Sequence, residues 1–224
     1  MPLMIFAAGF GTRMGDLTKT QPKPMIEVAG KPLIDRALDL ATGAGLSKIV
    51  VNTHYLADVL ETHLVDKQVL ISRETPDILE TGGGLKNALS LIDASCVTTF
   101  NPDAIWAGPN PISVIQSAWQ PDKMDALLLC VPLDRAIGRM GGGDFEVDEE
   151  GALRRPGDLV YGGVHIIKTH CVAEVDEAAF SLNVVWNRLA AENRVCVEIF
   201  EGYWCDVGTP EGITLAEQMI ADDV

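Results

Sequence analysis

Hydrophobic and polar positions in the first half of the chain alternate between strand-like and helix-like patterns. Short continuous apolar runs, typical of strands buried on both faces, occur at residues 3–8, 48–53, 69–72, 96–101 and 124–131. Between them, apolar residues three or four positions apart predict amphipathic helices at residues 33–44, 55–64, 83–92 and 112–119. Strands separated by helices of this length predict parallel pairing through right-handed crossovers. We therefore predict an α/β fold with an open, doubly wound, mostly parallel, Rossmann-like sheet.

The pattern changes after Pro132, where glycines and prolines interrupt the chain more often. Residues 145–153 predict a short hairpin that turns at Glu149, Glu150 and Gly151. Further strands are predicted at residues 161–167, 195–200 and 203–205, and further helices at residues 183–191 and 209–221. Thr209 is the predicted N-cap of the last helix, with Pro210 in its first turn. We predict one domain over residues 1–224, in which residues 132–224 supply a small β-rich lobe.

Composition narrows the class of protein. The chain has 224 residues, of which 47% are hydrophobic, enough to fill a sizeable core. No apolar run approaches the roughly 20 residues that cross a bilayer, and the N-terminus lacks the features of a signal peptide, so we expect a cytoplasmic protein. The cysteines are odd in number and show no zinc spacing, which predicts reduced core thiols at positions 96, 130, 171, 196 and 205.

The net charge of −15 argues against binding to nucleic acids or anionic membranes. Basic residues nevertheless gather early in the chain, at Arg13, Lys19, Lys23 and Lys31. Such a local cluster is compatible with a small phosphorylated substrate.

The segment from Ala7 to Met25 follows directly after the first predicted strand, the place where open α/β sheets bind ligands. Gly9 and Gly11 allow backbone N–H groups to approach a phosphate closely, and Thr12 adds a hydroxyl donor. Arg13 offers a charged fork for phosphate oxygens, and Lys23 lies between two prolines. The segment matches neither the P-loop nor the dinucleotide-binding fingerprint.

The letters AAGFGTRM and TKTQPKPM, followed by VAGKPLI, resemble the signature of the sugar-1-phosphate nucleotidylyltransferases. The resemblance covers residues 7–34 and implies that the backbone from Ala8 to Thr12, including Gly9 and Gly11, cradles the base and phosphates. It also implies that Arg13 contacts the departing pyrophosphate. Lys23 would stabilise charge at the α-phosphorus.

Three glycines follow Glu80 and Thr81 in a turn predicted to precede a helix, whose N-terminus presents free N–H groups. By resemblance this turn reads the nucleobase, with Glu80 and the backbone of Gly82 and Gly83 near its edge. The letters LETGGG look most like the N-acetylmuramate-1-phosphate uridylyltransferases and a mannose-1-phosphate guanylyltransferase-like group. This likeness favours UTP and N-acetylmuramate 1-phosphate as substrates and implies a place in peptidoglycan recycling.

Two aspartates follow apolar strands, Asp103 after residues 96–101 and Asp206 after residues 203–205. Both can reach the same rim of the sheet. Mg²⁺ bound by one or two carboxylates and by phosphates would neutralise charge during nucleotidyl transfer. Asp206 could instead be a turn residue before Thr209. The resemblance assigns it a metal role, because a segment like WCDVGTPE carries the second metal aspartate of the family.

One position departs from the family pattern. The family has glycine before the first aspartate, whereas this chain has Asn101, Pro102 and Asp103. Proline removes an N–H group and fixes φ, and a cis Asn101–Pro102 bond is one alternative.

The acceptor side is predicted by weaker likenesses. The segment GGGDF, which contains Gly143 and Asp144, resembles a sugar-binding segment of the muramate enzymes, and YGGVH, with Gly162, resembles a strand at their sugar pocket. We expect these three residues and Asn101 to bind the acceptor. Relatives carry Glu-Lys-Pro where this chain has Arg154, Arg155 and Pro156, so Asp144 or Asp158 would have to supply the missing carboxylate. Arg154 and Arg155 could equally be solvated surface residues, and the four histidines structural ones.

The resulting hypothesis is a Mg²⁺-dependent enzyme with catalytic residues Arg13, Lys23 and Asp103 and metal ligands Asp103 and Asp206. It transfers a nucleoside monophosphate, UMP being favoured, from an NTP to a sugar 1-phosphate. Residues 1–131 form the nucleotide-binding half, and the remainder binds the acceptor. Transfer of GMP to mannose 1-phosphate, transfer of CMP to phosphocholine, and a catalytically weak nucleotide-binding protein stay open. So does the choice between monomer and homodimer.

Overall fold

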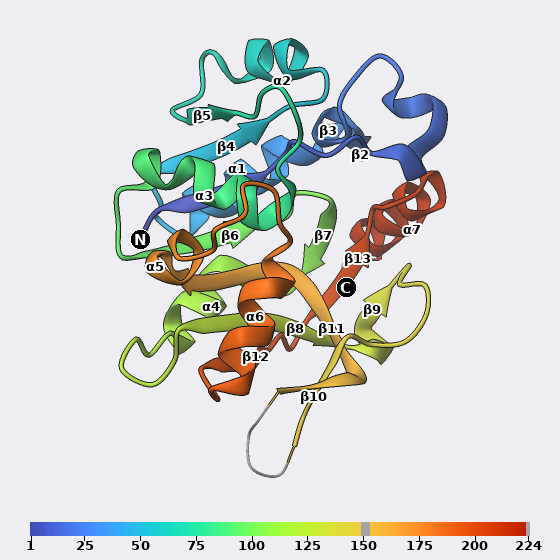
Figure 1. Ribbon diagram of the computed structural model, residues 1–224. Coiled ribbons are helices and arrows are strands. Elements are labelled where there is room, and N and C mark those ends of the chain that lie inside the picture. The colour runs from blue at the N-terminus through green and yellow to red at the C-terminus, as the bar shows by residue number, and fades with distance from the viewer. Residues whose placement is uncertain (149–152, 223–224) are drawn as a thin grey trace.

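The computed structural model describes residues 1–148 and 153–222, which build a central mixed sheet covered by helices (Figure 1). Seven of its strands form a continuous path, and β10 (Phe145–Val147) pairs with β11 beside that path. In order across the sheet, the seven are β12 (Val195–Ile199), β8 (Ala126–Pro132), β11 (Leu153–Lys168), β6 (Cys96–Phe100), β1 (Leu3–Phe6), β4 (Ile49–Thr53) and β5 (Leu70–Arg73).

Most strands of the sheet are parallel, as predicted. β6, β1, β4 and β5 pair in parallel, and β12 pairs in parallel with β8. β11 runs antiparallel to both β6 and β8, and it separates these two strands. A strand from the second half of the chain therefore lies in the middle of the sheet. Its side chains reach the same rim as those that follow β1 and β6.

Alternate residues of the central strands face two separate cores, as expected for strands buried on both faces. Leu3 and Ile5 of β1 face the first core, and Met4 faces the second. The first core includes residues of α1 (Leu33–Gly43), α2 (Ala57–Leu64) and α4 (Pro111–Ala118). The second includes residues of α3 (Glu80–Ile92), α5 (Thr169–Ala173) and α6 (Leu182–Ala191). Helices thus cover both faces of the sheet.

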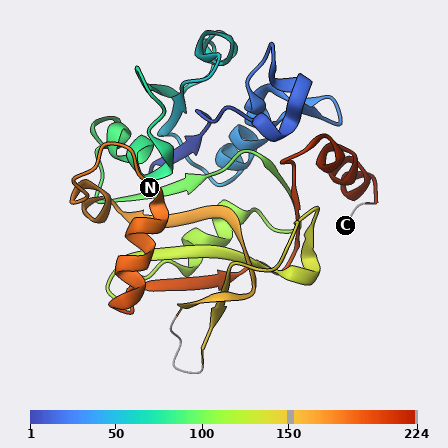
Figure 2. The same ribbon diagram turned by 45° about the vertical axis from the view of Figure 1, so that its right-hand side comes forward.

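A second, three-stranded sheet consists of β7 (Ala104–Ala107), β13 (Tyr203–Asp206) and β9 (Ala136–Ile137). Together with α7 (Pro210–Ala221), it contributes to a third core that also contains Met14 of the N-terminal loop. Both ribbon views show α7 beside this loop (Figures 1 and 2). Thr209 caps α7 by accepting a hydrogen bond from the Gly212 N–H (3.3 Å), as predicted. The third core thus joins the two ends of the chain. Two further strands of two residues each, β2 (Glu27–Val28) and β3 (Lys31–Pro32), pair with each other in a small separate sheet.

Helix α3 begins at Glu80, three residues earlier than predicted, so its glycines lie inside the first turns of the helix. Close packing explains this difference. A Cβ on Gly82 would lie 2.3 Å from the Phe180 ring, and one on Gly83 would lie 2.1 Å from the Ala178 carbonyl oxygen. The glycines therefore allow α3 to pack against residues 178–180, and the prediction of a turn before the helix was wrong.

The second half also differs in detail from the prediction. β11 begins at Leu153, eight residues before the predicted strand, and β7 was not predicted. β10 pairs antiparallel with β11, as the hairpin prediction required, whereas the predicted turn at Glu149, Glu150 and Gly151 lies outside the described residues. All five cysteines are free, and three of them are buried. The described part of the chain contains no helix with the length and apolarity that a membrane crossing requires.

Candidate active site

The loop after β1 turns back through the 3-10 helix η1 (Thr12–Thr18), and Gly11 makes this turn possible. Gly11 has a φ of 63°, in the left-handed region that favours glycine. A Cβ at this position would lie 2.9 Å from the Lys23 Cβ. The Thr18 hydroxyl donates to the Gly11 carbonyl oxygen (3.1 Å) and fixes the turn. The local sequence thus brings Lys23 against the glycine loop.

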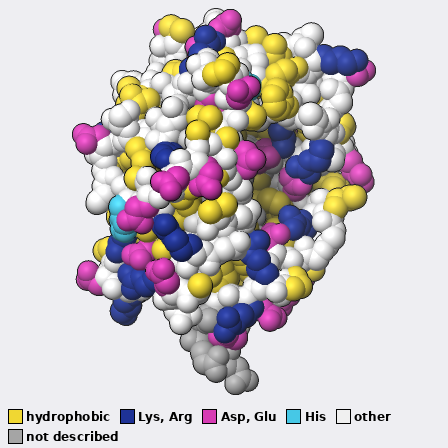
Figure 3. All heavy atoms as spheres, viewed as in Figure 1, with side chains coloured by type: hydrophobic (Ala, Val, Ile, Leu, Met, Phe, Trp, Pro, Cys, Tyr) yellow, Lys and Arg dark blue, Asp and Glu magenta, His cyan; other side chains and the backbone are white. Residues whose placement is uncertain are grey.

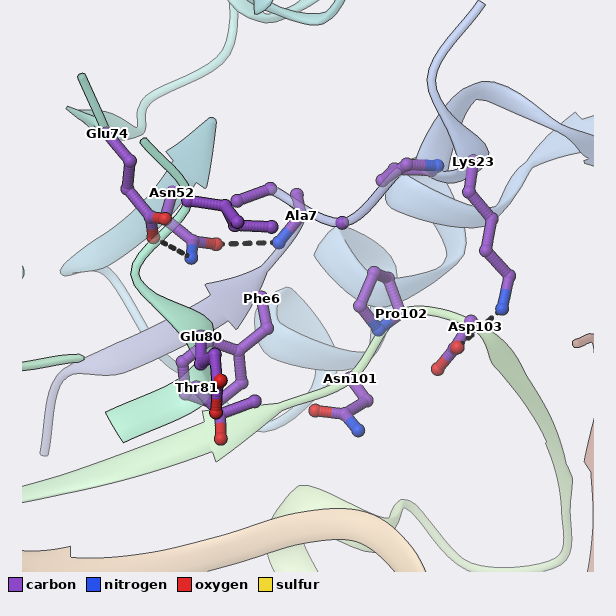
Figure 4. Close-up of a pocket in the computed structure, with 14 residues that line it drawn as sticks. Phe6, Ala7, Lys23, Asn52, Glu74, Glu80, Thr81, Asn101, Pro102 and Asp103 are labelled. Atoms are coloured by element: carbon purple, nitrogen blue, oxygen red, sulfur yellow. Dashed lines mark hydrogen bonds and ion pairs between the residues drawn. The ribbon is translucent and has the colours of Figure 1, made fainter. Parts of the chain in front are cut away.

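A buried hydrogen-bond chain holds the end of β1 in place (Figure 4). The Ala7 N–H donates to Asn52 Oδ1 (2.6 Å), and Asn52 Nδ2 donates to Glu74 Oε1 (2.7 Å). Glu74 is 1% exposed, and its second carboxylate oxygen accepts the Leu79 N–H (2.8 Å). These bonds tie together β1, β4 and the segment before α3. They position the backbone from which the glycine loop starts.

A cavity of about 210 Å³ opens beside this loop, and we call it the loop pocket. Six predicted site residues line it, namely Ala8, Gly9, Lys23, Glu80, Asn101 and Asp103 (Figure 4). They come from the glycine loop, the start of α3 and the end of β6. Segments that are far apart in the sequence therefore meet at the rim of the sheet.

Five predicted nucleotide-binding residues do not line the loop pocket: Gly11, Thr12, Arg13, Gly82 and Gly83. Thr12 is exposed, and Gly11 contributes through the turn described above. Gly82 and Gly83 are buried, and both of their N–H groups donate to the Phe180 carbonyl oxygen (2.8 and 3.1 Å). Their predicted role beside the base stays a prediction.

The two predicted metal aspartates lie close together. The Val207 N–H donates to the Asp103 carbonyl oxygen (2.9 Å), and Asp206 pairs with Ala104 in the antiparallel ladder of β7 and β13. Burial raises the pKa of the Asp206 carboxyl, and the negative charge of Asp103 raises it further. The small sheet therefore brings the two carboxylates to one place.

Each of these carboxylates also has a cationic neighbour. Lys23 Nζ lies 2.6 Å from Asp103 Oδ2, and Arg13 Nη1 lies 3.6 Å from Asp206 Oδ2. A Cβ on Gly208 would lie 2.6 Å from Arg13 Nη1, so glycine at this position leaves room for the guanidinium. The alternative of Asp206 as a mere turn residue is not favoured, because its carboxylate faces Arg13 and lines a cavity with Asp103. Asp103 and Asp206 are thus each paired with a cation.

This donor set fits Mg²⁺ only together with substrate oxygens. Within residues 1–148 and 153–222, no three His, Cys, Asp or Glu side chains are grouped so as to hold a metal ion. Mg²⁺ bound to phosphorylated substrates uses one or two carboxylates and fills its other positions with phosphate oxygens and water. Asp103 and Asp206 offer that number of carboxylates.

Asn101 and Pro102 connect the loop pocket to the acceptor side. The Asn101 N–H donates to the Gly163 carbonyl oxygen (2.8 Å), and a Cβ on Gly163 would lie 2.8 Å from the Asn101 Cβ. The Asn101–Pro102 bond is not cis; the cis bonds of the described chain precede Pro76 and Pro156. The cis alternative for the bond before Pro102 is therefore wrong.

A second cavity of about 320 Å³ adjoins the first, and we call it the arginine pocket. It shares Asn101 and Asp103 with the loop pocket. Its other lining residues include Arg13, Arg139, Asp144, Arg155, Gly162 and Asp206. In the space-filling view, side chains of both charge signs surround a hollow in this face of the molecule (Figure 3).

Asp144 is held in the arginine pocket by two partners. Arg139 Nη2 donates to its Oδ1 (2.7 Å), and the Tyr161 N–H donates to its Oδ2 (3.0 Å). Gly143 does not line the pocket; a Cβ there would lie 2.6 Å from the Gly157 carbonyl oxygen, so this glycine allows two backbones to approach. Asp158 does not line it either, which leaves Asp144 as the candidate carboxylate on this side.

Sequence reasoning missed several residues of the arginine pocket. Arg139, Asn183 and Trp186 were not singled out, and for Arg155 a solvated surface position was an equal alternative. These residues come from three separate segments, and no local motif links them. One feature of the sequence could have indicated a role in binding, namely the charged residue Arg155 shortly before a strand predicted to border the sugar pocket.

Behind the pocket lies a buried polar group around His165. The Thr99 and Tyr161 hydroxyls lie 2.5 and 2.7 Å from His165 Nδ1, and the ring meets the Trp186 ring edge to face. Burial lowers the pKa of His165 to about 3, so the imidazole is neutral near pH 7. This arrangement supports a structural role for His165, as expected from the sequence.

Comparisons with known proteins agree with this geometry. The chain matches the model of the MobA-like NTP transferase domain over residues 3–181. It is 40% identical to N-acetylmuramate alpha-1-phosphate uridylyltransferase of Caulobacter vibrioides, over 98% of this chain and 96% of the relative. The enzyme of the same name from Neisseria meningitidis serogroup B is 31% identical, over 93% and 94%.

Solved structures share the fold at lower identity. HddC from Yersinia pseudotuberculosis complexed with GMP-PN is 22% identical, with a TM-score of 0.77 over 98% of this chain and 99% of the other. UDP-glucose pyrophosphorylase complexed with UDP-glucose is 19% identical, with a TM-score of 0.79 over 100% and 99%. The predicted fold is thereby confirmed. From the family match and the two relatives together, we conclude that the chain belongs to the MobA-like NTP transferase family and is a sugar-1-phosphate nucleotidyltransferase.

Proposed function

We propose that this enzyme transfers UMP from UTP to N-acetylmuramate 1-phosphate and releases pyrophosphate, a step in peptidoglycan recycling in the cytoplasm. The observation that carries the proposal is the pair of adjoining pockets that share Asn101 and Asp103. One pocket offers a glycine loop suited to a nucleotide, and the other offers charged side chains suited to a phosphorylated sugar. Two relatives that align over nearly the full chain carry this activity in their names.

In this proposal UTP occupies the loop pocket. The backbone at Ala8 and Gly9 faces the phosphates and base, and Gly11 and Thr12 hold the loop in the shape that this requires. Glu80 lies near the base. Gly82 and Gly83 act by allowing α3 to pack closely, because their N–H groups already have a partner in Phe180.

The acceptor occupies the arginine pocket, where Asn101, Asp144 and Gly162 contact the sugar. Its phosphate oxygen attacks the α-phosphorus in line, a new P–O bond forms, and the bond to the β-phosphate oxygen breaks. The acceptor is already an anion, so the step needs no general base. Catalysis then consists of positioning and of charge stabilisation, which preorganised cations supply efficiently.

Lys23 and Arg13 are the cations that this chain contributes. Lys23 lines the loop pocket at Asp103, which suits stabilisation of charge at the α-phosphorus. Arg13 lines the arginine pocket beside Asp206, which suits contact with the pyrophosphate as it leaves. Asp103 and Asp206 would hold Mg²⁺, which when bound supplies further neutralisation of the phosphate oxygens.

The proposal is tested by pyrophosphate release from each of UTP, GTP, CTP and ATP, with each of four acceptors. The acceptors are N-acetylmuramate 1-phosphate, N-acetylglucosamine 1-phosphate, mannose 1-phosphate and phosphocholine. We expect the highest kcat/KM with UTP and N-acetylmuramate 1-phosphate, and no release after addition of EDTA. Preference for GTP with mannose 1-phosphate, or for CTP with phosphocholine, would replace the proposed substrates. Nucleotide binding without release in any combination would favour the weak nucleotide-binding alternative.

A further inference from the structure

The arginine pocket contains one cation whose charge no carboxylate balances. Arg13 pairs with Asp206, and Arg139 pairs with Asp144. Arg155 forms no ion pair anywhere in residues 1–148 and 153–222. In a chain with a net charge of −15, an unpaired arginine that lines a substrate cavity is informative. An anionic group on the ligand would complete this site.

The Arg155 guanidinium is held in position by neutral neighbours. Its Cζ lies 4.3 Å from the centre of the Phe145 ring, which is 1% exposed and belongs to the second core. Its Nη2 donates to Asn183 Oδ1 (2.6 Å). Arginine stacks on aromatic faces and keeps its donors in one plane, so this contact leaves donors free for a planar anion.

Asn183 is itself oriented toward Arg155. Its Nδ2 donates to Ser181 Oγ (3.0 Å), and its backbone N–H lies within hydrogen-bond distance of the same oxygen (3.3 Å) at the start of α6. The side-chain oxygen is thereby directed at the guanidinium. A fixed, exposed fork of this kind is the arrangement that binds carboxylates in a bidentate manner.

The 1-phosphate of the acceptor belongs where the two pockets meet. It must reach the α-phosphorus beside Asp103 and Lys23, which line the loop pocket, whereas Arg155 lines only the arginine pocket. Arg155 is therefore available to a second anionic group of the acceptor. N-acetylmuramate carries such a group, the carboxylate of its lactyl ether, and N-acetylglucosamine does not.

We infer that Arg155, oriented by Phe145 and Asn183, binds the acceptor's carboxylate and makes the enzyme select a carboxylated sugar 1-phosphate over the sugar 1-phosphate that lacks the carboxylate. This inference rests on the proposed function and assigns a specificity-determining residue within it.

The experiment compares Arg155→Gln with Arg154→Gln as a matched control. Arg154 is the preceding residue, but its Nε donates to Asp148 Oδ2 (2.8 Å) and it does not line the pocket. Steady-state kinetics with UTP are measured on N-acetylmuramate 1-phosphate and N-acetylglucosamine 1-phosphate. We expect Arg155→Gln to lower kcat/KM for the first acceptor about 10- to 100-fold, mainly through KM, because a charge-assisted contact is lost. The second acceptor should change less than about twofold, and Arg154→Gln should change neither.

The conservative variant Arg155→Lys keeps the charge and loses the fork, so it should recover part of the lost discrimination. Melting temperatures check that the variants fold. If the ratio of the two kcat/KM values is the same in Arg155→Gln as in the unmodified enzyme, the inference is wrong although the proposed function stands. A wild-type enzyme that uses both acceptors equally well would also overturn the inference. Absence of UMP transfer to either acceptor would overturn the proposed function itself, and the inference with it.

Discussion

The loop pocket and the arginine pocket adjoin each other but are built by different means. The loop pocket is lined in part by the backbone of one contiguous segment, which Gly11 and the Ala7–Asn52 hydrogen bond hold in place. The arginine pocket is lined by charged and aromatic side chains from residues 139–145, 155–163, 183–186 and 204–206. Phosphates are common to all NTPs, so backbone groups suffice to bind them. Acceptors differ from one another, and side chains from scattered segments can change to suit each one.

The two aspartates lie at the junction of the two pockets: Asp103 lines both, and Asp206 lines the arginine pocket. Asp103 follows β6, in the half proposed to bind the nucleotide, and Asp206 ends β13, in the half proposed to bind the acceptor. The pairing of β7 with β13 joins them. Substitutions at this junction should affect both substrates, and substitutions away from it should affect one side only.

The largest effect is expected at the junction. Asp103→Asn removes the carboxylate that lines both pockets and pairs with Lys23, so kcat in Mg²⁺ should fall about a thousandfold with the fold intact. Asp158→Asn is the control, because Asp158 lies in β11 like Arg155 but lines neither pocket. Near-wild-type turnover of Asp103→Asn in Mg²⁺, with circular dichroism unchanged, would rule out the metal role.

Removal of a cation should come next in size. Lys23→Ala should lower kcat about a hundredfold and raise the Kd for UTP much less, because its charge stabilises the reacting phosphate more than the bound one. Lys19→Ala is the control, since Lys19 is exposed and forms a surface ion pair with Asp16. An effect of Lys23→Ala confined to KM would instead identify Lys23 as a residue that binds ground state and transition state equally.

Two glycine substitutions should have smaller effects, one on the stability of the glycine loop and the other on its binding of UTP. Gly11→Ala introduces a Cβ 2.9 Å from the Lys23 Cβ at a φ of 63°, which should cost about 2 kcal/mol and lower Tm by about 5 °C. A Cβ on Gly9 would meet no atom within 4 Å, so Gly9→Ala should leave Tm unchanged and raise KM for UTP. Equal melting temperatures for the two variants would show that Gly11 does not control the loop's shape.

The same contrast explains what the sequence could predict. The glycine loop, Arg13 and Lys23 form one contiguous motif, and Asp103 and Asp206 both follow apolar strands, so local patterns predicted that they meet at one rim of the sheet. Their roles were predicted from the family resemblance. The glycines of α3 were wrongly predicted to form a turn because the residues against which they pack, 178–180, lie about a hundred positions away in the sequence. Arg154 and Arg155 look alike in the sequence, and only the pairing of β10 with β11 and the position of α6 bring one of them into the pocket.

The smallest effect is expected from removing an ion-paired residue of the strands that support the acceptor side. Asp125 lies just before β8. It accepts two hydrogen bonds from Arg194 and forms an ion pair with Lys168 of β11. Arg194 and Lys168 hold the pKa of Asp125 well below its usual range. The folded protein therefore binds fewer protons than the unfolded chain as pH falls through about 4, so the stabilisation is present above that pH and lost below it.

Asp125→Asn should accordingly lower the free energy of unfolding by about 1 kcal/mol at pH 7, a value reduced by solvent screening. The difference between variant and wild type should be smaller at pH 3 than at pH 7, because the Asp125 carboxylate of the unfolded chain is then protonated, and it should vanish only where the folded protein's carboxylate is protonated as well. Urea unfolding at both pH values measures this change. A loss of the same size at pH 7 and pH 3 would mean that Asp125 stabilises the strands through packing or neutral hydrogen bonds. In that case the acceptor side would not depend on charge for its framework as it does for its pocket.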